Sequence, residues 1–378
     1  MKLIHLSDLH LGKRIYEYSM LEEQDFILQQ ILQIVDAEQP DGLILAGDIY
    51  DKPIPPAEAV QLFDAFLVQL AERKLEVYII SGNHDSPERI AFGARLMDRS
   101  GIHLSPVYCG EVVPFSWEDE FGTVRIYLLP FLKPAQIRRY FGDGISSYTE
   151  AVSAAISNME IDPDERNVLV THQFVTGAAR TESEEILVGG SENIDASVFA
   201  PFDYVALGHL HAPQQCGAQH IRYCGTPLKY SFSEAKDQKS LTVVELLEKG
   251  RVVCRTVALI PKHDLVELRG SYAELTRKAF YENTSWQEDY THVTLTDEED
   301  IPDAMGKLRT IYHRLMKLDY DNRRTRTNQE IHGAAAPEAK SPLELFAEFY
   351  ALQNNQPLSD AQTAYLTELI AHTWEGEA

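Results

Sequence analysis

The chain has 378 residues, 44% of them hydrophobic, which is enough apolar material for the cores of about two or three domains. Its formal net charge of −24 excludes non-specific attraction of nucleic acid to the whole surface, so any nucleic-acid binding must use local sites. No apolar run is long enough for a membrane helix, and the opening residues lack the order of a signal peptide. The four cysteines form no CxxC pair, which indicates neither a zinc knuckle nor a disulfide framework, so we expect a cytoplasmic protein. We also expect no membrane partner.

Short apolar runs typical of strands alternate with helical patterns through about residue 235. The strands are expected at 2–7, 42–46, 76–81, 125–130, 167–171 and 204–207. The spacing of apolar residues predicts helices over 21–35 and 60–70, between the first three of these strands. Alternation of strand and helix indicates an α/β sandwich.

A hairpin is expected to close this first domain at residue 261, with antiparallel strands at 241–247 and 251–260. The pattern then restarts, and predicts a small α+β capping domain over 262–321. Its elements are expected to be a strand at 265–268, a helix at 272–280, a strand at 291–295 and a helix at 301–318. Residues 322–340 have no periodicity and are predicted to be a linker. Two capping boxes predict a helical segment over 341–378.

Polar clusters follow five of the apolar runs, where strands should end. The clusters are HLSDLHLG (5–12), LAGDIYD (45–51), ISGNHDS (80–86), VTHQF (170–174) and LGHLHAP (207–213). Because loops converge at the carboxyl ends of strands in α/β sheets, these clusters could bring seven donors together. The candidate donors are Asp8, His10, Asp48, Asn83, His172, His209 and His211.

Seven donors are too many for one metal and suit a pair of metals that share a carboxylate, an arrangement that acts in phosphoryl transfer. Carboxylate, amide and imidazole donors without a thiolate favour Mn, Fe or Zn, so we expect two divalent metal ions, with Mn²⁺ as the first choice. Each motif alone has a simpler explanation, since Asp, Asn and Gly are common in turns and a single His is usually hydrogen-bonded. All five motifs in order, each after a strand, are hard to obtain by chance.

The order D-x-H, G-D-x-x-D, G-N-H-D, a single His and G-H-x-H resembles the calcineurin-like metallophosphoesterase superfamily over about residues 1–235. The resemblance implies a two-layered β-sandwich flanked by helices, with a dinuclear metal centre. It implies that one metal is held by Asp8, His10, Asp48 and His211. It implies that the other metal is held by Asp48 as the bridge, Asn83, His172 and His209.

The same resemblance implies catalytic roles for two further residues. His84 would donate a proton or stabilise the leaving group, which suits an imidazole near neutral pH. Asp51 matches the second acid of G-D-x-x-D, which orients this His in many relatives; the alternative is a loop carboxylate that faces solvent. For Asp85 we favour a local turn cap.

The wider sequence resembles the SbcD family, the nuclease subunits of bacterial double-strand-break repair complexes. The stretches MKLIHLSDLHLGKRIYEYSMLEEQ and IRYCGTPLKYSFSEAKDQKSLTVVEL carry this resemblance, which is weak in detail after Lys262. It implies a metal-dependent DNA nuclease, both a 3′–5′ double-strand exonuclease and a single-strand and hairpin endonuclease, in DNA replication, recombination and repair. The implied partners are DNA, an SbcC-type coiled-coil ATPase and a second copy of the chain, as a homodimer within a heterotetramer. A phosphoesterase that acts on small molecules or proteins, and a scaffold with a degenerate site, remain alternatives.

Two later segments bear on these partners. Residues 305–327 carry seven basic side chains against two acidic ones and could contact DNA phosphates, although a solvated helix face is the alternative. Apolar stripes within 343–352 and 365–374 predict two short helices that cannot bury these faces alone. We expect residues 341–378 to dock on the ATPase; packing against the same chain is the alternative.

Overall fold

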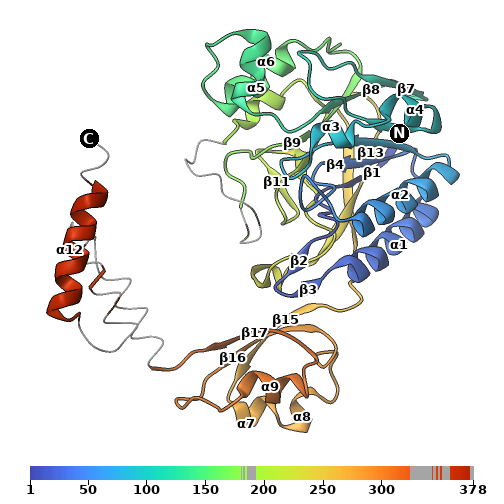
Figure 1. Cartoon of the computed structure of the whole chain (residues 1–378). Coiled ribbons are helices and arrows are strands. Elements are labelled where there is room, and N and C mark those ends of the chain that lie inside the picture. The colour runs from blue at the N-terminus through green and yellow to red at the C-terminus, as the bar shows by residue number, and fades with distance from the viewer. Residues whose placement is uncertain are drawn as a thin grey trace. The chain divides into compact units, whose positions relative to one another are not determined.

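The computed structural model describes residues 1–179, 181, 184, 193–323, 343, 346–347, 350 and 358–374 (Figure 1). The chain divides into two compact units, which are Met1–Thr294 with Ile301–Asp319 and Leu295–Asp300 with Tyr320–Ala378. Within the described residues, no helix has the length and hydrophobicity that a membrane crossing requires.

The larger unit contains two six-stranded sheets. The first has the order β14-β13-β1-β4-β5-β6, in which β1, β4, β5 and β6 are parallel neighbours and β13 and β14 are antiparallel additions. Its strands are β1 (Lys2–Leu6), β4 (Gly42–Ala46), β5 (Glu76–Ile80), β6 (Ile102–Leu104), β13 (Ser240–Leu246) and β14 (Val252–Ala258). These strands include the first three predicted ones and the predicted hairpin.

The second sheet has the order β11-β12-β10-β9-β8-β7, with a parallel centre of β8, β9, β10 and β12. Its strands are β7 (Phe115–Asp119), β8 (Gly122–Leu129), β9 (Arg166–His172), β10 (Tyr204–Gly208), β11 (Gln214–Cys216) and β12 (Ala218–Tyr223). One buried cluster joins the facing surfaces, with Leu3, Ile44 and Ile80 of the first sheet against Ile126, Val170 and Ala206 of the second. Burial on both faces explains why these parallel strands are continuous apolar runs.

Helices cover the outer faces of the two sheets (Figure 1). On the first sheet these are α1 (Leu21–Glu38) and α2 (Ala57–Glu72), whose apolar stripes join a core with the outward side chains of β1 and β4. The second sheet is covered by α5 (Pro134–Phe141), α6 (Tyr148–Ser157) and η2 (Ala196–Phe199). Shorter elements are β2 (Arg14–Ile15), β3 (Tyr18–Ser19), α3 (Pro87–Ile90), α4 (Ala94–Met97), η1 (Asp98–Ser100) and η3 (Phe232–Glu234). The predicted β-sandwich flanked by helices is confirmed.

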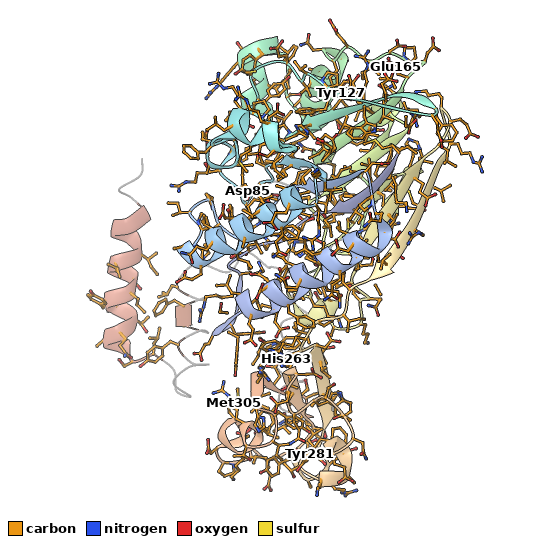
Figure 2. The ribbon with its side chains drawn as sticks, turned by 90° about the vertical axis from the view of Figure 1, so that its right-hand side faces the viewer. Asp85, Tyr127, Glu165, His263, Tyr281 and Met305 are labelled. Atoms are coloured by element: carbon orange, nitrogen blue, oxygen red, sulfur yellow. The ribbon has the colours of Figure 1, made fainter. Side chains whose placement is uncertain are left out.

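A third sheet follows the hairpin, with the order β15-β16-β17. Its elements are β15 (Leu265–Gly270), α7 (Tyr272–Leu275), α8 (Lys278–Tyr281), β16 (Tyr290–Leu295), α9 (Ala304–Arg309) and β17 (Arg314–Tyr320). Figure 2 labels His263, where the chain enters this region, and its Nδ1 lies 2.5 Å from Glu23 Oε1 of α1.

Two predictions in this region are wrong. The helix expected over 272–280 is two short helices, and the helix expected over 301–318 ends at Arg309 and is followed by strand β17. Tyr312 explains the second difference, because its fully buried side chain donates a hydrogen bond to the Leu275 carbonyl at 2.7 Å. This anchor fixes a turn after α9, and the following residues complete the sheet, so tertiary packing overrides local helix propensity.

The C-terminal part described by the structure contains α12 (Asp360–Trp374). It starts as the second predicted capping box requires, with the Ser359 side chain accepting from the Gln362 amide at 3.4 Å. Much of the predicted linker and of the first predicted tail helix lies outside the described residues, including Phe349 and Leu352 of its apolar stripe.

Candidate metal centre

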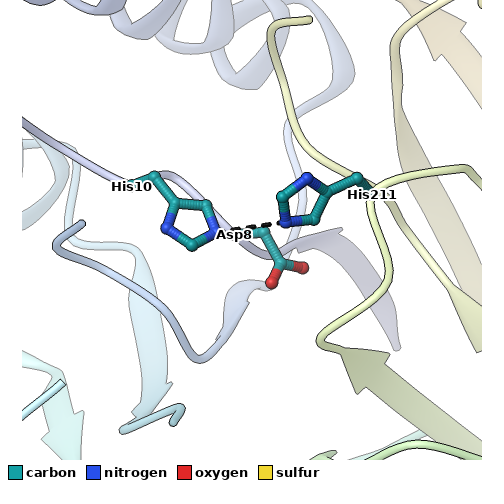
Figure 3. A group of neighbouring side chains, drawn as sticks. All are labelled: Asp8, His10 and His211. Carbon is teal, nitrogen blue, oxygen red and sulfur yellow. Dashed lines mark hydrogen bonds between the residues drawn. The ribbon is translucent and has the colours of Figure 1, made fainter. Parts of the chain in front are cut away.

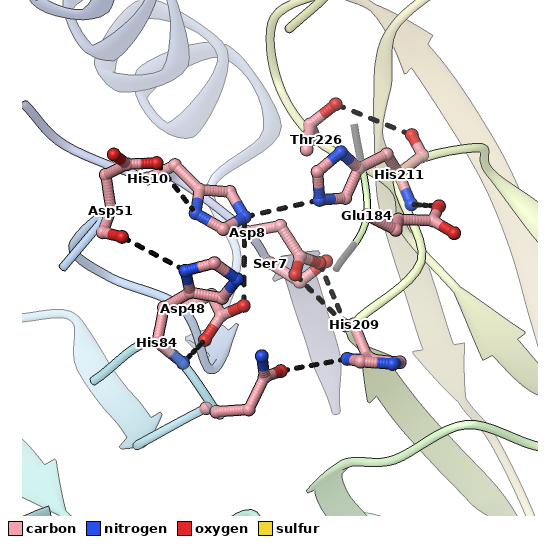
Figure 4. Close-up of polar contacts among 12 residues, drawn as sticks. Ser7, Asp8, His10, Asp48, Asp51, His84, Glu184, His209, His211 and Thr226 are labelled. Carbon is pink, nitrogen blue, oxygen red and sulfur yellow. Dashed lines mark hydrogen bonds and ion pairs between the residues drawn. The ribbon is translucent and has the colours of Figure 1, made fainter. Parts of the chain in front are cut away.

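Five loops meet at the carboxyl ends of β1, β4, β5, β9 and β10, and they bring all seven candidate donors together. Figure 4 labels Asp8, His10, Asp48, His209 and His211 of this set. Six of the donors are buried and Asn83 is partly buried. The loops come from both sheets, so the centre forms at the shared edge of the sandwich, as expected for parallel strands.

The backbone of these loops is unusual and aims the side chains inward. Four donors have positive φ: Asp8 (54°), His10 (44°), Asp48 (49°) and His209 (100°). Non-glycine residues rarely adopt this conformation, and it persists where the surroundings over-determine it, often at functional sites. Here the loops after β1 and β4 fix each other, since the Asp8 amide donates to the Gly47 carbonyl and the His10 amide to the Asp48 carbonyl, both at 3.0 Å.

Glycines let the loops approach one another. A Cβ atom on Gly82 would lie 2.1 Å from the Asp48 Oδ1 atom, and one on Gly208 would lie 1.9 Å from the Ala46 carbonyl oxygen. The motifs G-N-H-D and G-H-x-H therefore require glycine as their first residue because the loops pack too closely for a Cβ atom.

One group of donors, which we call the histidine side, consists of Asp8, His10 and His211 (Figure 3). The Nε2 atoms of His10 and His211 face each other at 3.2 Å, and the donor atoms of all three residues lie within 4.8 Å of one another. Burial lowers the pKa of both imidazoles, so both stay neutral as metal ligation requires. Two imidazole nitrogens that face each other at this distance fit a cation held by both.

The other group, the aspartate side, consists of Asp48, Asn83, His172 and His209. The Asn83 Oδ1 atom lies 3.0 Å from His172 Nε2 and 2.9 Å from His209 Nδ1, and Asp48 Oδ2 lies 3.2 Å from His172 Nε2. The same Asp48 oxygen lies 3.7 Å from His10 Nε2. Asp48 therefore stands between the two groups, where a bridging carboxylate is needed.

Outer contacts fix the orientation of His172. Its Nδ1 donates to the Ala46 carbonyl at 2.8 Å, because a carbonyl can only accept, and this directs Nε2 at the other donors. A second hydrogen bond of this kind orients His84, whose Nδ1 donates to the Asp51 carbonyl at 3.0 Å.

The two buried carboxylates have opposite pKa shifts. Burial raises the pKa of Asp8, and the neighbouring Asp48 charge raises it further. Burial also raises the pKa of Asp48, but attraction to the imidazoles, His172 first, lowers it more, so the net shift is downward. Two adjacent buried carboxylates that repel each other in this way are stabilised by positive charge between them. With carboxylate, amide and imidazole donors and no thiolate, the residues present fit divalent cations of the Mn, Fe or Zn type.

The side chain of Asp51 does not contact His84 through a hydrogen bond. Its Oδ1 atom accepts from Lys13 Nζ at 2.8 Å and lies 3.8 Å from His10 Nδ1, while its backbone carbonyl holds His84. The carboxylate is therefore neither a solvent-facing loop acid nor the direct partner of His84.

Asp85 has a larger structural role than the turn cap that its sequence suggests. Its carboxylate is buried and accepts from the Gly82 amide at 2.9 Å, as a local cap would, but also from the amides of Ile49 and Tyr50, each at 3.0 Å. Asp85 thus ties the loop that carries Asp48 to the loop that carries Asn83.

Further residues support the histidine side without any signal in the sequence. Gln24 of α1 is buried, donates to the His10 carbonyl at 2.8 Å and accepts from the Gly12 amide at 2.9 Å. The buried Tyr230 hydroxyl donates to the Leu9 carbonyl at 2.5 Å. Together they fix the loop after β1 on both sides of His10.

His211 is supported by a buried ion pair. Lys239 Nζ lies 2.6 Å from Glu234 Oε2 and donates to the His211 carbonyl at 2.9 Å, while Glu234 Oε1 lies 3.8 Å from His211 Nδ1. Burial raises the pKa of Glu234, but His211 and Lys239 more than offset this and lower it to about 2. The Glu184 carboxylate accepts from the His211 amide at 2.8 Å.

Comparison with known proteins gives matches over both parts of the chain. Residues 1–213 match the family described as calcineurin-like phosphoesterase, and residues 261–354 match the type 5 capsule protein repressor C-terminal domain. The SbcD subunit of nuclease SbcCD from Staphylococcus epidermidis is 31% identical over 386 residues, covering 100% of both chains. The same subunit from Staphylococcus saprophyticus is 32% identical over 337 residues, covering 88% of this chain and 87% of the relative. Among solved structures, a dimetal phosphatase from Danio rerio is 13% identical with a TM-score of 0.41, covering 69% of this chain and 96% of that one.

Proposed function

The chain belongs to the calcineurin-like phosphoesterase family and is a hydrolytic phosphodiesterase with a divalent-metal site, and from this premise we propose that its substrate is DNA. The observation that carries the proposal is the full-length similarity to the SbcD subunit of nuclease SbcCD, in a chain that brings all seven donors and His84 together. The function we propose is a 3′–5′ double-strand exonuclease and single-strand and hairpin endonuclease for DNA replication, recombination and repair.

We assign the donors to two cations, preferably Mn²⁺. One is held by Asp8, His10, Asp48 and His211, and the other by Asp48, Asn83, His172 and His209. Bound there, the cations would supply Lewis-acid stabilisation of the phosphate and lower the pKa of a water molecule. The chain contributes a fixed, mostly buried set of ligands and excludes bulk water from them.

His84 is the proposed proton donor. Its amide donates to Asp48 Oδ1 at 2.9 Å, and a ring nitrogen lies within 4.8 Å of ligand atoms of His10 and Asp48, so the residue stands beside the donors. Because Nδ1 donates a hydrogen bond to the Asp51 carbonyl, Nε2 is the nitrogen that can deliver a proton to the departing 3′ oxygen. Asp51 acts through its carbonyl in this proposal, and Lys13 holds its carboxylate in place.

We assign the domains as nuclease (1–261), capping domain with a DNA contact (262–321), linker (322–340) and ATPase-docking segment (341–378). Part of the basic segment is already paired within the chain, since Arg314 contacts Glu288 at 2.9 Å and Lys317 contacts Asp319 at 2.7 Å. DNA must compete with these acids, whereas Arg324 and Arg326 lie outside the described residues. We propose an SbcC-type coiled-coil ATPase as the partner of a homodimer in the cytoplasm.

The docking proposal has a direct test. A chain ending at residue 340 is co-expressed with the SbcC-type ATPase, and recovery of the ATPase with the purified chain is compared with that of the full-length chain. Loss of co-purification, with a normal melting temperature of the truncated chain, supports docking through 341–378. Undiminished recovery would assign the tail to packing on its own chain.

The substrate proposal is tested with a hairpin-ended DNA duplex in Mn²⁺, with and without the ATPase and ATP, and with His84→Ala as the control. Cleavage that requires His84 and increases with partner and ATP supports the nuclease. Absence of DNA cleavage together with rapid hydrolysis of small phosphoesters would keep the metal centre and replace DNA with a small-molecule or protein substrate.

A further inference from the structure

An open pocket of about 550 Å³ lies beside the metal centre, within the larger unit. The β2–β3 hairpin, the segment around η3 and the third sheet line it. Its walls include Lys13, Arg14, Tyr16, Phe232, His292 and Lys317. None of these side chains has a role in the proposed chemistry apart from Lys13, which holds Asp51.

The pocket is connected to the histidine side of the centre. Tyr230 lines it, and the Tyr230 ring lies 5.8 Å from the His10 ring and 6.4 Å from the His211 ring, between centroids. Lys13 also connects the pocket lining to this side of the centre, since its amide donates to the His10 carbonyl at 3.0 Å. An extended substrate bound at the metal centre could therefore reach the pocket.

Aromatic rings line the pocket in an exposed position. Tyr16 is 54% exposed at the tip of the hairpin, with φ of 52°, a conformation that bulky residues rarely adopt. Its ring centroid lies 6.3 Å from that of Phe232, which in turn lies 5.2 Å from the His292 ring. Folding alone does not favour an exposed ring on such a backbone. A ligand with flat rings would stack on the Tyr16 ring and would give it a function.

The charge of the lining selects the kind of ligand. Lys13, Arg14 and Lys317 face one acid, Glu267, in a chain whose net charge is −24. Lys13 and Lys317 are also paired with acids just outside the lining, Asp51 and Asp319, so a bound phosphate must compete with these two carboxylates. Cations interleaved with exposed aromatic rings are the arrangement that binds single-stranded nucleic acid, by phosphate contact and base stacking.

We propose that this pocket binds one unpaired nucleotide of the DNA strand, next to the phosphate being cleaved, with its base on Tyr16. The proposal rests on the proposed nuclease function and sharpens it. An unpaired nucleotide is required because the bases of a duplex are already stacked on each other and present only their edges. The enzyme would accordingly prefer overhangs and hairpin loops to blunt duplex ends.

The test uses the full-length chain and two substrates, a 3′-overhang oligonucleotide and bis(p-nitrophenyl) phosphate. Removing the ring with Tyr16→Ala should reduce the ratio of kcat/KM for the oligonucleotide to that for the small ester by about tenfold, within the range for one stacked base. Tyr16→Trp should restore the ratio. Tyr140→Ala is the matched control, because Tyr140 is 47% exposed outside the pocket, and should leave the ratio unchanged.

A second measurement follows the base directly. With 2-aminopurine next to the cleaved phosphate, binding to the wild-type chain should quench its fluorescence by stacking, and binding to Tyr16→Ala should not. If the wild-type chain cleaves the oligonucleotide and Tyr16→Ala keeps both the ratio and the quenching, the pocket proposal is wrong and the nuclease proposal stands. If the wild-type chain cleaves only the small ester, the nuclease proposal fails, and this pocket assignment fails with it.

Discussion

The two sides of the metal centre are built by different means. On the histidine side, His10 and His211 depend on side chains from distant elements, with Gln24 supporting the first and the Glu234–Lys239 pair supporting the second. On the aspartate side, His172 depends on the backbone carbonyl of Ala46 at the end of β4, in the other sheet, and the Asp85 carboxylate links two loops through their amides.

This difference suggests that the two sides respond differently to substitution. The backbone carbonyl that supports His172 is part of strand β4 and cannot be removed without changing the fold, so Asp85 is the support on the aspartate side that a substitution can test. Side-chain support on the histidine side can be removed one group at a time, and each group should affect its own donor. Asp48 belongs to both sides, because its Oδ2 atom is near both His172 and His10.

The largest effect is expected at Asp48, because this residue belongs to both sides and its substitution should not distinguish them. Asp48→Asn removes the charge that both sides share, so metal content should fall on both. Cleavage should fall by more than the roughly 10²–10⁴-fold that a general acid or base contributes. Metal per chain by mass spectrometry and DNA cleavage in Mn²⁺ are the measurements. Loss of one metal with the other retained would show that Asp48 does not bridge.

The second prediction separates chemistry from metal binding. His84→Ala should lower cleavage by about 10²–10⁴-fold, the range for general acid–base catalysis, while both metals stay bound. The reason is geometric, since the His84 ring is held through the Asp51 carbonyl and its hydrogen bond to Asp48 is made by its backbone amide. Metal content and kcat are measured on the same preparation, and a large loss of metal would contradict the catalytic role.

The third prediction addresses the aspartate side alone. Asp85→Asn replaces one acceptor oxygen by an amide group that cannot accept from the Ile49, Tyr50 and Gly82 amides together. Metal affinity or activity should fall by about 100-fold, the upper end of the range for groups that orient metal ligands. The affinity of the weaker metal is measured by titration of the metal-free chain.

Asp203→Asn is the matched control for this prediction. Asp203 also accepts from two backbone amides, those of Asn167 at 2.7 Å and Gly250 at 3.1 Å, but lies outside the donor set. Its substitution should lower the melting temperature and leave metal affinity intact. Equal metal affinity in the two variants would mean that Asp85 only stabilises the fold.

The same comparison explains how much the sequence could predict. Each candidate donor stands at the end of a buried strand or in the loop after it, and the rule that loops meet at the carboxyl ends of parallel strands is enough to group them. The supporting residues have no such pattern, since Gln24 lies in a helix among other polar residues and Lys239 is 28 positions from His211. Asp85 stands within a motif, yet the sequence indicates only its local bond, because its partners Ile49 and Tyr50 are far away along the chain.

The fold shows the same limit. The central strands were predictable because burial on both faces makes them continuous apolar runs. Strand β17 was predicted as part of a helix because its pattern is short and mixed, and the group that decides it, Tyr312, acts through a hydrogen bond to Leu275. Local sequence patterns do not contain such long-range anchors.

The smallest effect on metal binding is expected from the histidine side. Glu234 Oε1 is 3.8 Å from His211 Nδ1, too far for a hydrogen bond, so its influence on this ligand is electrostatic only. Glu234→Gln should therefore lower metal affinity by about tenfold, the lower end for outer-shell groups. It also removes the nearer acid beside the buried Lys239 and leaves Asp237 at 3.9 Å, so the free energy of unfolding should fall by about 3 kcal/mol. Adding Lys239→Met should recover most of that stability without recovering the metal affinity. Recovery of both together would show that the ion pair supports His211 only through the fold, and that the two sides of the centre do not differ in the way described.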